Sequence, residues 1–211
     1  MQKNKFMILK LYEDNPSDIY IRKTVETLED GGVVIIPTDS VYAIVCNINR
    51  PKAIDRVAQI KGTKIEKADF SFIFNDLSGL SEYTMPMSND VFKVLKRNLP
   101  GPFTFILDAN TKIPKIFKNK KKTLGIRIPN NNICRKIVEV LGNPLMCTSV
   151  LDVDEIIEYT TDPSLIYDNY KNIVDLIIDG GYGNNTASTV VDCTNDKISI
   201  LRQGEFELLR H

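Results

Sequence analysis

GGVVIIPTDSVYAIV, residues 31–45, is the stretch of the chain that decides its fold. Residues 33–36 are all β-branched and lack polar alternation, which predicts a strand buried on both faces of a sheet covered by helices. Pro37 ends this strand, and a Thr-Asp-Ser turn follows at residues 38–40. Open α/β sheets bind ligands just beyond such strand ends. The alternative is that the turn residues only cap the strand, and this stretch alone leaves both interpretations open.

Helical and extended patterns alternate along the rest of the chain. Apolar residues at helical spacing predict helices at 16–30, 51–60, 88–98, 130–141 and 162–170, with Val91, Phe92 and Leu95 facing the core in the third. Short apolar runs predict strands at 33–36, 41–46, 70–74, 103–107, 123–128, 145–148, 174–178, 188–193 and 197–202. The last two strands have no helix between them, which favours a mixed sheet. We expect a single α/β domain: a twisted mixed sheet with flanking helices.

The composition is that of an ordinary globular protein, and its balanced charge does not indicate a class of binding partner. The 211 residues are 43% hydrophobic, and 27 Lys and Arg residues balance 27 Asp and Glu residues. No apolar run approaches the roughly 20 residues that span a membrane, and the polar start is not a signal peptide. We therefore expect a cytoplasmic protein without a membrane partner. The sequence does not indicate an oligomeric state.

Histidine and cysteine usage exclude several kinds of catalysis. The single histidine is His211, which rules out a Ser-His-Asp or Cys-His mechanism and a histidine metal site. The four cysteines are far apart and form no Cys-x-x-Cys pair, so we expect buried free thiols and no metal site. Any chemistry must depend on Lys, Arg, acidic side chains, hydroxyls and backbone groups.

Polar residues recur at the ends of the predicted strands and could meet in one cleft. They are Thr38, Asp39, Ser40, Thr123, Arg127, Thr148, Ser149, Ser188, Thr189 and Arg202. Hydroxyls and backbone N–H groups bind phosphate or carboxylate oxygens, and Lys and Arg neutralise them, so such a lining suits an anionic ligand. The alternative for each residue is a hydrogen bond to a nearby loop.

Two cations, one from these strand ends and one from the end of a predicted helix, are further candidates for binding an anion. Arg127 lies between Ile126 and Ile128; it faces water, or it faces the cleft and binds a carboxylate or phosphate through both edges of its fork. Lys61 ends a predicted helix, where it stabilises the helix dipole or reaches a phosphate. The sequence leaves both pairs of alternatives open.

The segment 111–122 is rich in lysine, including Lys115, Lys118, Lys120, Lys121 and Lys122. Such a run is usually a solvated loop, and the alternative is contact with an RNA backbone, whose affinity would fall steeply with salt. The chain contains neither G-x-x-x-x-G-K-[ST] nor G-x-G-x-x-G. A nucleotide would therefore bind without either common glycine loop.

The order of several motifs resembles the YrdC/YciO family from about residue 10 to residue 207, which we treat as one YrdC-like domain with no second domain. These motifs are PTDSVYAI, KG after a helix, LPGPFTFIL, GIRIP, CTSV, STVVD and ILRQGE. Within the family the chain is most similar to the YciO branch, because LPGPFTFIL, KKKTLGIRIPNN and VDLIIDGGYG occur together as they do there.

The resemblance implies a concave basic cavity and a known reaction. In the YrdC branch, L-threonine, bicarbonate and ATP give threonylcarbamoyl-AMP and pyrophosphate, the first step of the t6A modification of tRNA. Carried over by position, Thr38, Arg127, Thr148 and Ser188 would bind threonine, and Lys61, Lys64, Thr123, Ser149 and Arg202 would bind the nucleotide. Lys61 and Arg127 would be the catalytic residues. Mg²⁺ would be held through the phosphates and would need no protein ligands.

Two positions depart from the synthase pattern. The synthases have K-x-R where this chain has Lys61-Gly62-Thr63, so Lys64 would have to substitute for an arginine. They have S-x-N where this chain has Thr148-Ser149-Val150. Losing a polar contact to a charged group costs about 1.5–3 kcal/mol, which predicts a weaker synthase or an altered substrate. The alternatives are a protein that binds double-stranded RNA through the lysine run, and a nucleotide-binding protein without catalysis.

Overall fold

A computed structural model of the chain describes residues 7–65, 70–111, 122–150 and 161–210. Its strands belong to one sheet, in the order β1-β8-β2-β3-β7-β4-β6-β5-β9-β10. The strands are β1 (Met7–Lys10), β2 (Val34–Ile36), β3 (Ala43–Asn47), β4 (Ser71–Ile73), β5 (Phe103–Asp108), β6 (Thr123–Arg127), β7 (Leu145–Ser149), β8 (Leu176–Asp179), β9 (Thr189–Asp192) and β10 (Ser199–Arg202). The main helices are α1 (Asp18–Glu29), α2 (Pro51–Ile60), α3 (Asn89–Asn98), α4 (Asn132–Leu141) and α6 (Pro163–Tyr170).

The sheet is mixed, as the sequence predicted. Parallel pairs join β1 to β8, β8 to β2, β4 to β6 and β5 to β9. Antiparallel pairs join β2 to β3, β3 to β7, β7 to β4, β6 to β5 and β9 to β10. The predicted α/β fold with a twisted mixed sheet and flanking helices is therefore confirmed.

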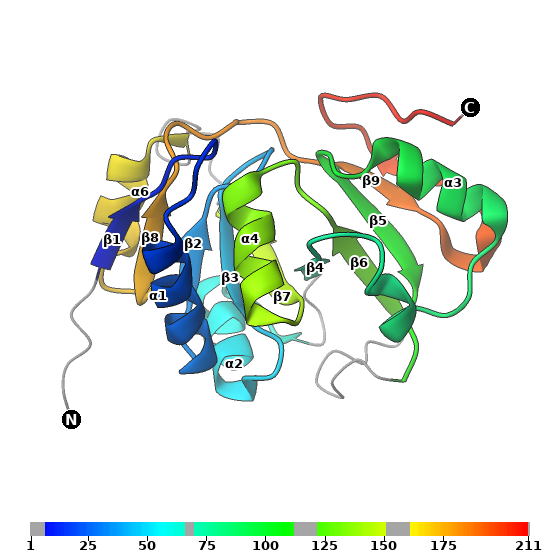
Figure 1. The fold of residues 1–211 in the computed structure, drawn as a ribbon. Coiled ribbons are helices and arrows are strands. Elements are labelled where there is room, and N and C mark those ends of the chain that lie inside the picture. Colours follow the sequence, from blue (N-terminus) through cyan, green and yellow to red (C-terminus); the bar gives the residue numbers. More distant parts are fainter. Residues whose placement is uncertain (1–6, 66–69, 112–121, 151–160, 211) are drawn as a thin grey trace.

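Alternation along the strands divides the core into two clusters, one on each face of the sheet. Val34 and Ile36 of β2 pack with residues of α1 and α4, whereas Ile35 packs with residues of α2. Figure 1 shows α1 and α4 side by side over the half of the sheet that contains β8, β2 and β3. All three β2 residues are buried, which explains their unbroken apolar sequence.

The sheet half that contains β6, β5 and β9 is covered on one face. There Phe105, Ile126 and Val191 pack with Val91 and Leu95 of α3. Within the described residues, the cluster beneath α1 and α4 has no member from β5, β6, β9 or β10. No helix in the described parts of the chain therefore contributes apolar residues to the other face of this half, and the polar strand residues face that space.

One predicted core contact of α3 is wrong. Phe92 is 43% exposed, whereas Val91 and Leu95 are fully buried. Position 92 lies 100° around the helix from position 91, so the side chain falls outside the buried stripe.

Among the helices that the structure describes, none has both the length and the apolar composition of a membrane span.

Candidate functional site

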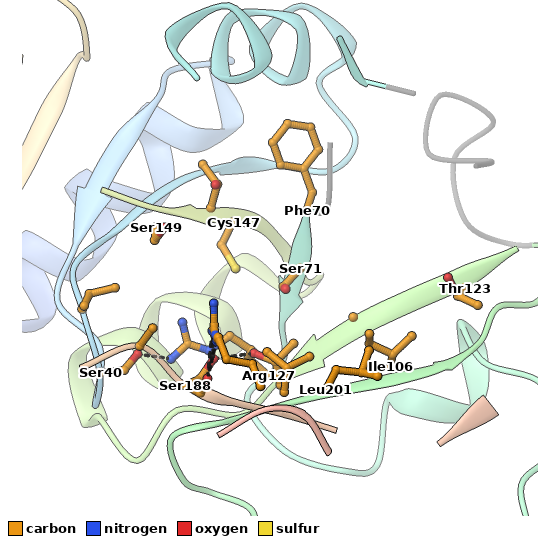
Figure 2. A pocket seen from close by; sticks show the side chains of 17 residues that line it. Ser40, Phe70, Ser71, Ile106, Thr123, Arg127, Cys147, Ser149, Ser188 and Leu201 are labelled. Carbon is orange, nitrogen blue, oxygen red and sulfur yellow. Dashed lines mark hydrogen bonds between the residues drawn. The ribbon is translucent and has the colours of Figure 1, made fainter. Parts of the chain in front are cut away.

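The uncovered face of the sheet contains a cavity of about 410 Å³ (Figure 2). Its walls come from the turn after β2, from six strands and from the segment before β9. The lining residues are Ser40, Val41, Phe70, Ser71, Thr104, Ile106, Thr123, Gly125, Arg127, Cys147, Thr148, Ser149, Ala187, Ser188, Val190, Leu201 and Arg202. The described cavity wall contains no carboxylate, so a metal ion there would be bound through the phosphates of a ligand.

Strand alternation explains why polar residues of apolar strands meet in this cavity. On β6, Thr123, Gly125 and Arg127 face the cavity, whereas Leu124 and Ile126 belong to the core. Because GIRIP alternates in this way, its arginine faces the cleft and not the solvent. The sequence left these two orientations of Arg127 open.

Arg127 is 7% exposed, and one edge of its guanidinium is held by the turn after β2. Its Nη2 donates to Ser40 Oγ at 2.7 Å, Asp39 Oδ1 at 3.2 Å and Thr38 Oγ1 at 3.4 Å. Its Nε is buried and has no hydrogen-bond partner in the described residues. A buried donor without an acceptor is costly, so this atom is suited to a ligand oxygen or a water.

Asp39 is the counter-charge of Arg127 and was only a candidate ligand contact from the sequence. Its Oδ2 accepts a hydrogen bond from the backbone N–H of Asn130 at 2.7 Å, and its side chain is 9% exposed. Burial raises the pKa of Asp39, although the charge of Arg127 and the Asn130 N–H act in the opposite direction. The carboxylate thus joins the turn after β2 to the connection between β6 and α4.

Thr38 caps the end of the strand, which is one of the two roles that the sequence left open, and it also lies beside Arg127. Its hydroxyl donates to Val41 O at 2.8 Å and accepts from Ser40 N at 3.1 Å. Thr38 is buried and does not line the cavity, whereas Ser40 does. Ser40 is therefore the turn residue that a ligand would meet, and its hydroxyl contacts Arg127 as Figure 2 shows.

Arg202 enters the cavity from the edge strand β10 because of a β-bulge. The pairing of β10 with β9 shifts between Ile200 and Arg202, so Leu201 is the extra residue. Leu201 and Arg202 consequently both line the cavity, which regular alternation would prevent. Arg202 donates to the carbonyl of Ser188 through Nε at 3.2 Å and Nη2 at 2.8 Å. Burial, and to a lesser extent the charge of Arg127, lowers its pKa.

Ser188 connects Arg202 to Thr104 through a small hydroxyl network. Its hydroxyl lies 2.8 Å from that of Thr104 and accepts a 3.4 Å hydrogen bond from Nη2 of Arg202. The sequence did not single out Thr104. The signal that could have found it is the polar residue inside FTFIL, which shares a strand face with Ile106 and not with the core phenylalanines.

The remaining predicted residues differ in how close they lie to the cavity. Thr123, Thr148 and Ser149 line it. Lys61 is half-buried and donates to the carbonyl of Ser149 at 3.2 Å, which places it beside the cavity wall. Lys64 is exposed and does not line the cavity.

The lysine run can be located only in part. Lys115, Lys118, Lys120 and Lys121 lie outside the described residues. Lys122 is described and is exposed, with a left-handed φ of 50°. RNA binding through this run stays a prediction.

Val150 lies in the core and not in the cavity. It is fully buried, its N–H donates to Tyr42 O, and its carbonyl accepts from the Tyr170 hydroxyl. The asparagine of the S-x-N pattern is thus replaced by a residue that packs away from any ligand.

All four cysteines are buried free thiols, as predicted. Cys147 lines the cavity, but burial raises its pKa to about 11, even though the charge of Arg127 acts to lower it. A thiol with this pKa is protonated at neutral pH and is a poor nucleophile. The groups of the described cavity wall that remain available for chemistry are therefore its hydroxyls and the two arginines, with Lys61 beside the wall.

Comparison with known proteins relates the chain to one family along most of its length. The family model described as Sua5_yciO_yrdC, Telomere recombination, matches residues 26–204. The chain is 38% identical over 196 residues to YciO of Escherichia coli (strain K12), covering 92% of this chain and 93% of that protein. It is 30% identical over 129 residues to a threonylcarbamoyl-AMP synthase of Nitrosococcus oceani, covering 61% of this chain and 69% of that protein.

Two solved structures share the fold. The crystal structure of E. coli YciO has a TM-score of 0.89 at 36% identity and covers 97% of this chain and 98% of that one. The structure of P. abyssi Sua5, solved in complex with L-threonine, has a TM-score of 0.81 at 22% identity. That comparison covers 94% of this chain but 57% of the Sua5 chain, and at this identity it shows the fold alone.

Proposed function

Because this chain belongs to the Sua5/YciO/YrdC family, we propose that its cavity binds ATP and L-threonine and catalyses threonylcarbamoyl-AMP synthesis. The family includes threonylcarbamoyl-AMP synthases, which supports an enzyme of this class. The single observation that carries the proposal is the buried, unpartnered Nε of Arg127 in a cavity lined by hydroxyls and a second arginine. These donors suit a ligand that is rich in anionic oxygens.

The carboxylate end of the cavity lies at Arg127. A carboxylate oxygen of threonine accepts from Nε, and the hydroxyls of Ser40, Ser188 and Thr148 surround the rest of the amino acid. These groups are fixed by their own hydrogen bonds, so little ordering is needed when the ligand binds. Thr38 acts through the turn that it caps.

The phosphates of ATP are assigned to Arg202, the second arginine of the cavity. Thr123 and Ser149 also line the cavity, and Lys61 lies behind Ser149. The volume of about 410 Å³ is within the range of ligand pockets, about 300–1,000 Å³. Mg²⁺ would be held by the phosphates of ATP, because the described cavity wall has no carboxylate, and it would add to the neutralisation of the leaving pyrophosphate.

The reaction requires alignment and charge neutralisation and no histidine. The threonine amine and bicarbonate condense to a carbamate with loss of water. A carbamate oxygen then forms a bond to the α-phosphorus, and the bond from that phosphorus to the pyrophosphate oxygen breaks. Arg127 holds the amino acid in line, and Lys61 and Arg202 stabilise the negative charge on the departing oxygens.

The buried Val150 and the Thr63 position limit this activity. Two lost polar contacts to charged groups, each about 1.5–3 kcal/mol, would slow the reaction by orders of magnitude. The proposal is thus a weak synthase, or a synthase with an altered acceptor in place of threonine.

Pyrophosphate release tests the proposal. Purified protein at high concentration, with Mg²⁺ and ATP, should release pyrophosphate only when L-threonine and bicarbonate are both present. Thr63→Arg should raise the rate, because it restores the arginine of the K-x-R pattern without placing a polar side chain in the core. If pyrophosphate release is absent in the natural protein and in Thr63→Arg, the synthase proposal is wrong. Thermal stabilisation by ATP without turnover would then support nucleotide binding alone.

A further inference from the structure

The proposed reaction leaves the carboxylate of Asp39 without a role. Both of its oxygens are engaged, one with Arg127 Nη2 at 3.2 Å and one with Asn130 N at 2.7 Å. Asp39 is nearly buried and does not line the cavity, so a ligand would not touch it. It can act on a ligand only through its charge and through its hold on Arg127.

The two arginines of the cavity differ in charge compensation. Arg127 is paired with Asp39, with side-chain exposures of 8% and 9%. Arg202 contacts the carbonyl and hydroxyl of Ser188, and it forms no ion pair with any residue that the structure describes. Arg127 therefore offers donors whose charge is neutralised, whereas Arg202 has no counter-charge among the described residues.

We propose that Asp39 is a specificity-determining residue that makes the Arg127 end accept a monocarboxylate and reject phosphate dianions. The identity of the carboxylate as L-threonine rests on the proposed function, whereas the charge argument depends only on the cavity. Coulomb energy scales with the product of the charges, so a dianion is repelled by Asp39 twice as strongly as a monoanion. Phosphates are directed to Arg202, which no carboxylate contacts among the described residues.

The hydrogen bonds support the same division. Nη2 of Arg127 already donates to three oxygens, so the donors left for a ligand are Nη1 and the buried Nε. These donors and the neighbouring neutral hydroxyls suit a single carboxylate. A phosphate dianion needs several donors and net positive charge to replace its hydration, and Asp39 removes that charge.

The test is a titration with inorganic phosphate and L-threonine, followed by NMR of the arginine Nε–H groups. The Arg127 and Arg202 signals are assigned with Arg127→Lys and Arg202→Lys. In the natural protein, L-threonine should shift the Arg127 signal and phosphate the Arg202 signal, and both ligands should bind together. In Asp39→Asn, phosphate should bind about tenfold more tightly, shift the Arg127 signal and compete with L-threonine.

The matched control is Asp168→Asn. Asp168 is an exposed acid of α6 that pairs with Lys171, so its substitution makes the same change of net charge away from the cavity. This variant should bind both ligands as the natural protein does. An equal gain in phosphate affinity in both variants would mean that net charge and not Asp39 is responsible.

Two results would overturn the inference. One is competition between phosphate and L-threonine in the natural protein, a measurement that does not require Asp39→Asn to fold. The other is unchanged phosphate affinity in folded Asp39→Asn. If L-threonine shifts no signal in any variant, the proposed function fails. The phosphate titration still decides the role of Asp39, with acetate replacing L-threonine as the monocarboxylate.

Discussion

Arg127 pairs with Asp39 through Nη2, as a lysine could, and keeps further N–H donors, among them the buried Nε, that a lysine would not supply. In Arg127→Lys the charge stays and the fork is lost, so L-threonine affinity should fall by about 1.5–3 kcal/mol, roughly 10- to 100-fold. Calorimetric titration measures this loss.

Arg127→Met provides the comparison for stability. This substitution leaves the buried carboxylate of Asp39 without its counter-charge, and the free energy of unfolding should fall by about 3–5 kcal/mol. Urea unfolding should show a much smaller loss for Arg127→Lys. Equal losses of stability in the two variants would contradict the ion-pair argument.

The raised pKa of Asp39 predicts a pH dependence with a definite sign. Between the ordinary value of 3.8 and the raised value, the folded protein holds a proton that the unfolded chain has lost. The contribution of Asp39 to the free energy of unfolding therefore decreases as pH rises through this window. Arg127 is the charge that faces it, and the neighbouring Cys134 and Cys147 thiols stay neutral because burial raises their pKa values.

Urea unfolding of the natural protein and of Asp39→Asn at several pH values isolates this term. The free energy of unfolding of the natural protein minus that of Asp39→Asn should decrease as pH rises from 3.8 and become constant above the raised pKa. A difference that grows with pH would mean that the ion pair outweighs burial and that the sign is reversed.

At the residue scale the sequence singled out Arg127, Ser188 and Arg202, which the structure brings into one cavity, because a cation or hydroxyl in an apolar strand is conspicuous. The sequence could not show that Asp39 pairs with Arg127, because 88 residues separate them and the contact exists only after β2 and β6 enter one sheet. Nor could it show that Val150 faces the core and Ser149 the cavity. That difference depends on where β7 ends.

Among the elements, β6 carries the cavity floor at Gly125. A Cβ at this position would lie 3.1 Å from Ser71 Oγ and 3.5 Å from Thr104 Cγ2. Gly125→Val should therefore fill the floor and abolish the rise in melting temperature that ATP produces. Valine suits a strand, so the ligand-free melting temperature should change by only a few degrees. Differential scanning fluorimetry with and without ATP measures both quantities.

The graded control for this prediction is Gly125→Ala. It adds one methyl group and should weaken the ATP effect without removing it. Full ATP stabilisation in Gly125→Val would show that the nucleotide binds elsewhere.

Elements with a regular apolar pattern were predictable, and irregular ones were not. The predicted helix at 51–60 coincides with α2, and the predicted strand at 123–128 covers β6. β1 was not predicted, because it is an edge strand with one buried residue in four and has no clear apolar pattern. The bulge in β10 was also not predictable, because an extra residue leaves no mark in a short alternating strand.

For the whole molecule, burial predicts a gradient of backbone protection across the sheet. All residues of β2 and β3 are buried, and all residues of β10 are exposed. Amide hydrogen exchange should be slowest in Val34–Ile36 and Ala43–Asn47 and fastest at the β10 edge. Adding ATP and L-threonine should slow exchange in β6, β9 and β10.

The distant edge of the sheet supplies the internal control. Exchange in β1 and β8 should be unaffected by these ligands, because neither strand lines the cavity. Protection gained equally along the whole sheet would indicate general stabilisation and not occupation of this cavity.

The uncovered half-face of the sheet has a consequence for how such a protein changes over time. Along β5 and β6, every second residue belongs to the core and the residues between them face the cavity. Residues that stabilise the fold therefore alternate with residues that would contact a ligand along the same strands. Substitution of the cavity-facing residues alters the chemistry of the cavity and leaves the core residues unchanged. Relatives can thus diverge in what they bind while keeping a nearly superimposable backbone.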